Sequence, residues 1–210
     1  MSTYAPSRAE DSERRFEPEQ RMLLVGVPWS VYASLRDALD EAGSHVQLTY
    51  FDGDLELMSS SSDHEESKVL LGRLLEAWCL DTGIDLFPLG STTQRNQGAA
   101  RGLEADESYC IGRRAPRPDL AIEIVYSAWR VEKLEVYRGL GIGELWVMRG
   151  GRIAVHRLVD GAYESGSTSA LFPALDLDIL ARCAVPGPAS GRRFARSATR
   201  SPASSRDQPA

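Results

Sequence analysis

The residue with the clearest chemical implication is Glu123, which lies inside the apolar segment Leu-Ala-Ile-Glu-Ile-Val-Tyr at 120–126. This composition is typical of a β-strand that is buried on both faces. An ionised carboxylate in such a strand is costly unless a basic side chain or a metal ion compensates for its charge. Two interpretations follow: a structural Glu–Lys or Glu–Arg pair (or a glutamate facing water), and a carboxylate that binds metal.

Asp106 and Lys133 favour the second interpretation. Asp106 begins another expected strand, and two adjacent strands could bring its carboxylate close to that of Glu123. Such a pair could share a Mg²⁺ ion, which prefers oxygen ligands and retains several of its waters. Lys133 opens the helix after the Glu123 strand, where it could stabilise a pentavalent phosphate or orient an attacking water. Taken alone, Lys133 fits better as a solvated residue paired with Glu132 or Glu135.

Apolar periodicity predicts the elements that would position these side chains. A first helix is expected to be capped by Ser30 and to end at Gly43. Alternating segments on both sides of Asp52-Gly53 predict a β-hairpin. A long amphipathic helix should follow, with a capping box at Asp63 and an end near Gly83.

The remaining pattern alternates between strands and helices. Strands are expected at 84–89, 92–95, 107–111, 120–126, 144–148 and 152–159, and helices at 131–140 and 175–181. The predicted fold class is therefore α/β (α+β), a mixed β-sheet flanked by helices with an N-terminal helix and a β-hairpin.

Composition divides the chain into three parts. Residues 1–21 and 185–210 are predicted to be disordered, the second segment being rich in Arg, Ser, Pro and Ala, and residues 22–184 are predicted to form one domain. No apolar run approaches the ~20 residues of a membrane-spanning helix, and no secretory signal is visible. Three unpaired cysteines without CxxC spacing agree with a cytoplasmic protein.

The charge distribution argues against strong binding of nucleic acid by the domain itself. The whole chain has a net charge of -6, but residues 187–210 contain five arginines and one aspartate. This tail of +4 leaves -10 for the rest, which would repel phosphates unless metal ions or a basic groove intervened.

Four motifs occur in the order and spacing of a known family: DGDLELMSSSSDHE, GLEADESYCI, PDLAIEIVYS and EKLEVYRGLGIGELWV. Over about residues 28–182 the sequence resembles the Uma-type restriction endonuclease family of the PD-(D/E)XK nuclease superfamily. The resemblance implies a restriction-endonuclease-like fold and an endonuclease that hydrolyses phosphodiester bonds with Mg²⁺ or Mn²⁺. DNA is the expected substrate.

On this resemblance, Asp106 matches the aspartate of the PD motif and Glu123 matches the following acidic residue. Lys133 resembles a displaced motif lysine, because Val125 occupies the usual lysine position. Three further residues match positions that line the family's site: Glu56, His64 and Glu65. In the superfamily an acidic residue on the first long helix is an additional metal ligand, which implies metal binding by Glu65, with Glu56 as a further candidate.

Some of these assignments have equally simple structural explanations. Glu56 could face solvent, and Glu65 could simply favour the N-terminal end of the helix dipole. The family's proline before the PD aspartate is Ala105 here, and Cys110 replaces a tyrosine. Asp119 also follows a proline, but it precedes Glu123 by four residues on one strand, about 13 Å away, and fits a strand start better.

The alternative to a nuclease is a catalytically silent binding or assembly module that retains the nuclease fold. The acidic domain favours this alternative. A different hydrolase has little support, because the sequence has neither a GxSxG nor an HExxH motif. A homodimer is plausible for a nuclease, because cutting two strands requires two sites or a repositioning step.

Overall fold

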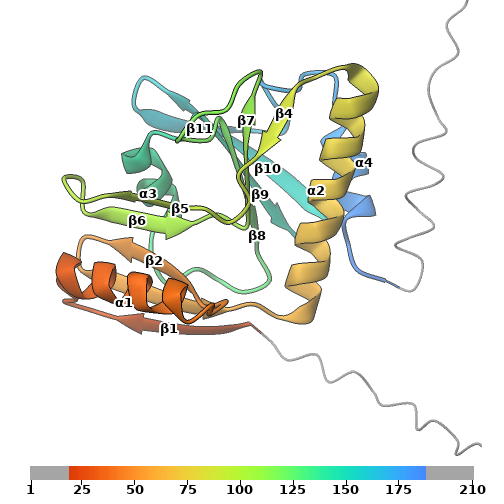
Figure 1. Cartoon of the computed structure of the whole chain (residues 1–210). Coiled ribbons are helices and arrows are strands. Elements are labelled where there is room, and N and C mark those ends of the chain that lie inside the picture. Colours follow the sequence, from red (N-terminus) through yellow and green to blue (C-terminus); the bar gives the residue numbers. More distant parts are fainter. Residues whose placement is uncertain (1–18, 188–210) are drawn as a thin grey trace, which may run out of the picture.

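In the computed structural model, which describes residues 19–187 of the 210-residue chain, two β-sheets and four helices form the fold (Figure 1). The first sheet has the order β1-β3-β2-β6-β5. Its strands are β1 (Gln20–Leu24), β2 (Gln47–Phe51), β3 (Asp54–Ser59), β5 (Thr93–Asn96) and β6 (Arg101–Glu104).

The second sheet has the order β11-β10-β9-β8-β7-β4, in which only β8 and β9 are parallel neighbours. Its strands are β4 (Leu86–Pro88), β7 (Glu107–Ile111), β8 (Leu120–Ile124), β9 (Glu144–Arg149), β10 (Arg152–Val159) and β11 (Ala162–Gly166). The predicted α+β class, with mixed β-structure flanked by helices, is confirmed, and its strands divide between two sheets.

Four helices cover these sheets: α1 (Trp29–Glu41), α2 (Ser62–Thr82), α3 (Lys133–Leu140) and α4 (Leu177–Cys183). Helices α2 and α4 lie side by side, at the right of Figure 1, and pack on one face of the six-stranded sheet. Helix α3 packs between the sheets and contacts strands of both. No helix in this part of the chain has the length and apolar character needed to cross a membrane.

Alternation along β8 separates the core from the site. Leu120, Ile122 and Ile124 belong to the apolar cluster beneath α2 and α4. Ala121 and Val125 belong to the cluster beneath α3, so the side chain of Glu123 also lies on the α3 face. Burial of both faces of β8 is what the nearly continuous apolar sequence predicts.

Helix α1 covers the five-stranded sheet through a small aromatic cluster. Tyr32 is fully buried and stacks on Tyr50, with ring centroids 4.9 Å apart. This approach requires glycine at position 102, because a Cβ atom there would lie 2.2 Å from the Tyr32 hydroxyl oxygen. An alanine at that position would force the Tyr32 ring out of its present position.

Two helix caps differ from those predicted. Pro28 precedes α1 without a side-chain cap, and Ser30 lies within the first turn. Ser61 caps α2, where its hydroxyl accepts a hydrogen bond from the backbone nitrogen of His64 (3.2 Å), and Asp63 is already helical. In a run of four serines, the sequence alone does not distinguish which hydroxyl meets the first free backbone donors.

The predicted hairpin is confirmed, with Asp52 and Gly53 at φ +49° and +98°. Two structural features lie just outside the predicted domain: β1 begins at Gln20, and Val185 packs against the core. The remaining predicted disorder, at 1–18 and 188–210, lies outside the described residues.

Candidate active site

Neighbouring antiparallel strands place Asp106 and Glu123 opposite each other. Glu107 of β7 pairs with Ile122 of β8, so the preceding residue of one strand faces the following residue of the other. The backbone nitrogen of Ile124 donates to Oδ2 of Asp106 at 2.7 Å. Both acidic side chains are buried, with at most 1% of either residue exposed.

Helix α3 supplies the partners of Glu123. Lys133 Nζ lies 2.7 Å from Glu123 Oε2, and the hydroxyl of Tyr137 donates to Oε1. The four-residue spacing puts Lys133 and Tyr137 on one side of α3. Burial raises the pKa of Glu123, although the charge of Lys133 opposes that rise.

The Lys133 ammonium also lies 5.7 Å from the ring centroid of Trp129 and is 1% exposed. The sequence-based alternative, a solvated lysine paired with Glu132 or Glu135, is therefore wrong. The Glu123–Lys133 pair itself agrees with both interpretations of Glu123, as a structural pair and as a site carboxylate.

His64 and Gln47 bind the Asp106 carboxylate from the other side. His64 Nε2 donates to Oδ1 at 2.8 Å, and Gln47 Nε2 donates to the same oxygen at 2.9 Å. Burial alone would raise the pKa of Asp106, but the hydrogen bond and charge of His64 lower it to about 2. Burial opposes the charge on His64, whereas hydrogen bonds to Asp106 and Glu19 raise its pKa to about 9. At neutral pH the imidazolium thus neutralises the aspartate.

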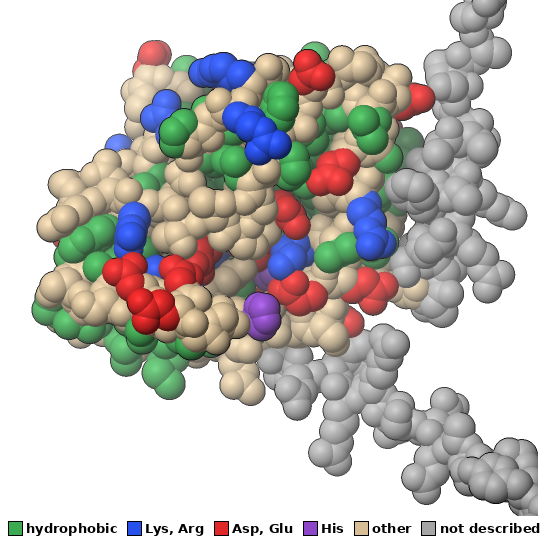
Figure 2. Space-filling model, viewed as in Figure 1, with side chains coloured by type: hydrophobic (Ala, Val, Ile, Leu, Met, Phe, Trp, Pro, Cys, Tyr) green, Lys and Arg blue, Asp and Glu red, His purple; other side chains and the backbone are tan. Residues whose placement is uncertain are grey.

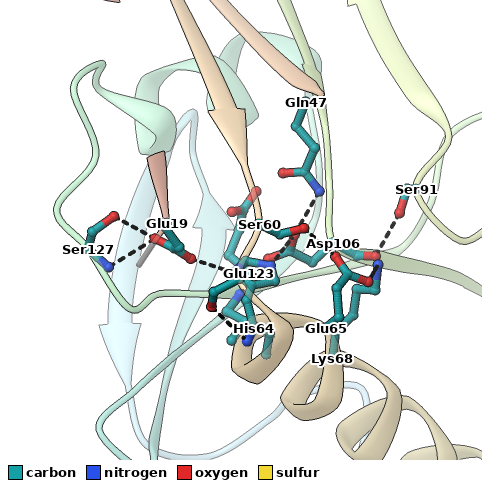
Figure 3. Close-up of polar contacts among 12 residues, drawn as sticks. Glu19, Gln47, Ser60, His64, Glu65, Lys68, Ser91, Asp106, Glu123 and Ser127 are labelled. Atoms are coloured by element: carbon teal, nitrogen blue, oxygen red, sulfur yellow. Dashed lines mark hydrogen bonds and ion pairs between the residues drawn. The ribbon is translucent and has the colours of Figure 1, made fainter. Parts of the chain in front are cut away.

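Glu19 is a residue of this site that the sequence analysis did not identify. His64 Nδ1 donates to Glu19 Oε1 (2.5 Å), and the backbone nitrogen of Ser127 donates to Oε2 (3.1 Å) (Figure 3). Burial favours the protonated form, but hydrogen bonds from His64 and Ser127 and the charge of Arg21 lower the pKa of Glu19 to about 2. The apolar run at 22–25 could have indicated the strand β1, which places Glu19 beside His64.

Glu56 lies close to this N-terminal strand and does not face solvent. Its side chain on β3 is 1% exposed, and its Oε1 accepts from Arg21 at 2.6 Å. Its Oε2 accepts from the backbone nitrogen of Arg130, in the segment between β8 and α3. Glu56 therefore links the N-terminal strand to the segment before α3. Among the described residues, its hydrogen bonds do not include Asp106 or Glu123.

Glu65 lines a cleft of about 510 Å³, whose walls include two residues that hydrogen-bond to Asp106. It accepts from Ser60 Oγ (2.7 Å) and pairs with Lys68 Nζ (2.5 Å). The cleft is also lined by Gln47 and Ser91. Figure 2 shows acidic and basic side chains close together beside α2 on this face. Glu65 thus lines an open cleft, and its partners among the described residues are Ser60 and Lys68, not Asp106 or Glu123.

The donors around Asp106 and Glu123 suit a hard divalent cation. Among residues 19–187, no three His, Cys, Asp or Glu side chains are arranged as a complete metal site. However, the two opposed carboxylates are oxygen donors, and Gln47 Oε1 is buried without a hydrogen-bond partner in this part of the chain. Mg²⁺ commonly takes one or two protein carboxylates and completes its shell with water and substrate oxygens, so the donor chemistry fits.

Asp119 has the structural role that its position predicts. It directly precedes β8, and its Oδ2 accepts from the backbone nitrogen of Ile111 at 2.9 Å. The side chain therefore fixes the end of β7 and is not part of the group around Asp106.

The two sheets, with helices on their faces and a parallel pair at the centre of the larger sheet, define a restriction-endonuclease-like fold of the PD-(D/E)XK class. More specifically, the chain belongs to the Uma2 family, whose model, described as "Putative restriction endonuclease", matches residues 32–184. A search of curated proteins finds no match. The matched range includes every site residue that the sequence predicted, whereas Glu19 and Arg21 lie before it.

Proposed function

We propose that this protein is a metal-dependent endonuclease that hydrolyses phosphodiester bonds, with DNA as its substrate. Membership of a restriction endonuclease family supports nuclease activity in general. The observation that carries the finer proposal is the opposition of Asp106 and Glu123 across two strands, with Lys133 on the second carboxylate. We further propose a cytoplasmic homodimer, which would supply one site for each DNA strand.

Asp106 and Glu123 are the residues that would hold Mg²⁺ or Mn²⁺, and Glu65 could add a carboxylate from the cleft. A bound divalent ion supplies a water of lowered pKa and an electrophilic contact to a phosphate oxygen. Lys133, held by Glu123 and Trp129, provides a fixed positive charge for the negative charge that develops on phosphorus. His64 orients the carboxylate of Asp106 through its Nε2 proton.

The proposal is tested by incubating plasmid DNA with the purified full chain and Mg²⁺ or Mn²⁺. The wild type should cut, EDTA should stop cutting, and Glu123→Ala should reduce the rate by at least roughly 100-fold. Glu144→Ala is the matched control, since Glu144 is another buried strand glutamate that contacts none of the proposed site residues. Equal cutting by the wild type and Glu123→Ala would overturn the proposal.

A second candidate function, a silent binding module, is favoured by the closure of the site. Asp106, Glu123 and Lys133 are each at most 1% exposed, and each already has a charged partner. Calorimetry distinguishes the two candidates: a nuclease site should take up Mn²⁺ in a manner that Asp106→Asn abolishes, and a silent module should show no such uptake.

A further inference from the structure

The N-terminal strand reaches into the candidate site at its first described residue. Glu19 directly precedes β1, and its side chain has no exposed surface. β1 is the edge strand of the five-stranded sheet and pairs with β3, which carries Glu56. This segment lies outside the part of the chain that the family model matches. The family match therefore does not cover Glu19, and its place at the site is given by its contacts in this chain.

The contacts of Glu19 form a chain of hydrogen bonds that ends on the PD aspartate. Glu19 Oε1 accepts from His64 Nδ1 at 2.5 Å, and His64 Nε2 donates to Asp106 Oδ1 at 2.8 Å (Figure 3). The imidazole is thus held at both nitrogens, between two carboxylates. Glu19 is fixed in turn by Ser127, through its backbone nitrogen and hydroxyl, and by Arg21.

We propose that Glu19 is a positioning residue that holds the His64 ring against Asp106, and thereby sets the orientation of the Asp106 carboxylate. The second side-chain torsion of histidine is broad, so hydrogen bonds at the ring nitrogens help to fix the orientation of the ring. Its Nε2 contact with Asp106 therefore depends on what binds Nδ1, on the far side of the ring. The consequence for catalysis, though not the positioning itself, rests on the proposed nuclease function.

A purely structural role for Glu19 makes a different prediction. Glu144 shows what such a role looks like: it is 2% exposed and accepts from Trp146, Ser169 and the backbone nitrogen of Ala170. Removing either carboxylate leaves buried donors unsatisfied and lowers stability. Only removal of Glu19 should alter a bond that Glu19 does not itself make, the one between His64 and Asp106.

The first test uses metal-free full chain and the ring N–H protons of His64 in nitrogen-15 NMR spectra at neutral pH. In the wild type, the Nδ1 and Nε2 protons should both be observed, because both are bound to carboxylates. In Glu19→Ala, both signals should be lost, including that of Nε2 on the far side of the ring. In Glu144→Ala, both should remain. A persistent Nε2 signal in folded Glu19→Ala would overturn the proposal.

Glu19→Gln keeps the measurement decisive if Glu19→Ala does not fold. The glutamine has a single acceptor oxygen, which it must share between His64 and Ser127. Both His64 ring protons should then exchange with water measurably faster than in the wild type, because the shared oxygen holds each donor less tightly. Exchange rates equal to those of the wild type would overturn the proposal.

The second test concerns cutting and uses a double-variant cycle. Glu19→Ala should lower kcat by ~10- to 100-fold, the usual loss when a partner of a metal-binding side chain is removed. KM should change little. Because Glu19 acts through His64, the same change should have little further effect in a His64→Gln background. Equal losses of kcat in both backgrounds would overturn the proposal. If the wild type does not cut plasmid DNA at all, the proposed nuclease function is contradicted, and the NMR experiment still tests the positioning role of Glu19.

Discussion

Glu123 and Glu144 are buried glutamates on neighbouring parallel strands, β8 and β9, and different groups stabilise their carboxylates. Glu144 accepts hydrogen bonds from the Trp146 indole, the Ser169 hydroxyl and a backbone amide, all of them uncharged. Glu123 has a charged partner, Lys133, and a second carboxylate, Asp106, acts on it from the adjacent strand. Burial is nearly the same, at 2% and 1% exposure.

This difference shows that a buried carboxylate alone does not indicate a site. The hydrogen bonds of Glu144 hold the loop at Ser169 and Ala170 against the start of β9. This is a structural role. A buried ion pair such as Glu123–Lys133 adds little stability compared with apolar residues of the same volume. The pair alone therefore does not distinguish a structural role from the proposed catalytic one, in which the lysine would offset negative charge that develops on phosphorus.

The largest expected effect separates the two glutamates by activity. Glu123→Gln keeps the side-chain volume but removes a charged oxygen donor, so plasmid cutting with Mn²⁺ should fall by roughly 10³-fold. Glu144→Gln should change the cutting rate by less than about twofold, since it lies on no path to the candidate site. Similar losses in both variants would mean that activity reports only the integrity of the sheet.

Removing the cation from Glu123 should have a large effect on stability. Lys133→Met leaves a buried carboxylate without its partner, and should lower the free energy of unfolding by ~3–5 kcal/mol at neutral pH. Urea unfolding measures this loss, and the double variant Glu123→Gln, Lys133→Met should recover most of it. A loss below about 1 kcal/mol would show that the pair is solvated in solution.

The cost of Lys133→Met should also depend on pH. Burial raises the pKa of Glu123 in the folded state, so the folded state binds the proton more tightly than the unfolded state does. The variant should therefore be more stable at pH 5 than at pH 8, as the carboxyl loses its proton when pH rises. Glu144 has no cation to remove, and Glu144→Gln should lack this dependence.

The next effect concerns the alkaline side of the pH profile. The pKa of His64 is raised to about 9 by Asp106 and Glu19, above the 6.5 of an unperturbed histidine. The stabilisation from its charge is therefore fully present below about pH 6.5 and is lost as pH rises through about 9. Unfolding measured from pH 6 to 10 should show this loss in the wild type and not in His64→Gln. Matching profiles would contradict a charged His64.

Local sequence patterns were enough to predict the elements next to the site. The hairpin, α2, β7, β8 and α3 follow from short-range periodicity and turn residues, and Asp106, Glu123 and Lys133 lie on or beside the last three. The missed strands are β1, β6 and β11. Strands β1 and β11 are edge strands with mostly exposed residues on both faces, so no apolar alternation marks them.

Contacts between distant parts of the chain could not be predicted in this way. Glu19 meets Ser127 across 108 positions, and Gln47 meets Asp106 across 59. Neither residue type is unusual in its local sequence. Tyr137 could have been noticed, because it follows Lys133 by one helical turn and so shares its face.

The smallest expected effect tests the structural side of the comparison. Glu144→Gln replaces one acceptor oxygen by a donor nitrogen, so the backbone nitrogen of Ala170 or the Ser169 hydroxyl loses its partner. The free energy of unfolding should fall by ~1–3 kcal/mol, the cost of a buried donor left unsatisfied. Urea unfolding should show this loss at pH 6 and pH 8 alike, while Mn²⁺ uptake remains that of the wild type. A change in Mn²⁺ affinity would instead show that β9 influences Glu123, whose register neighbour on β9 is Val147. The structural role of Glu144 could then not be separated from the metal-binding role proposed for Glu123.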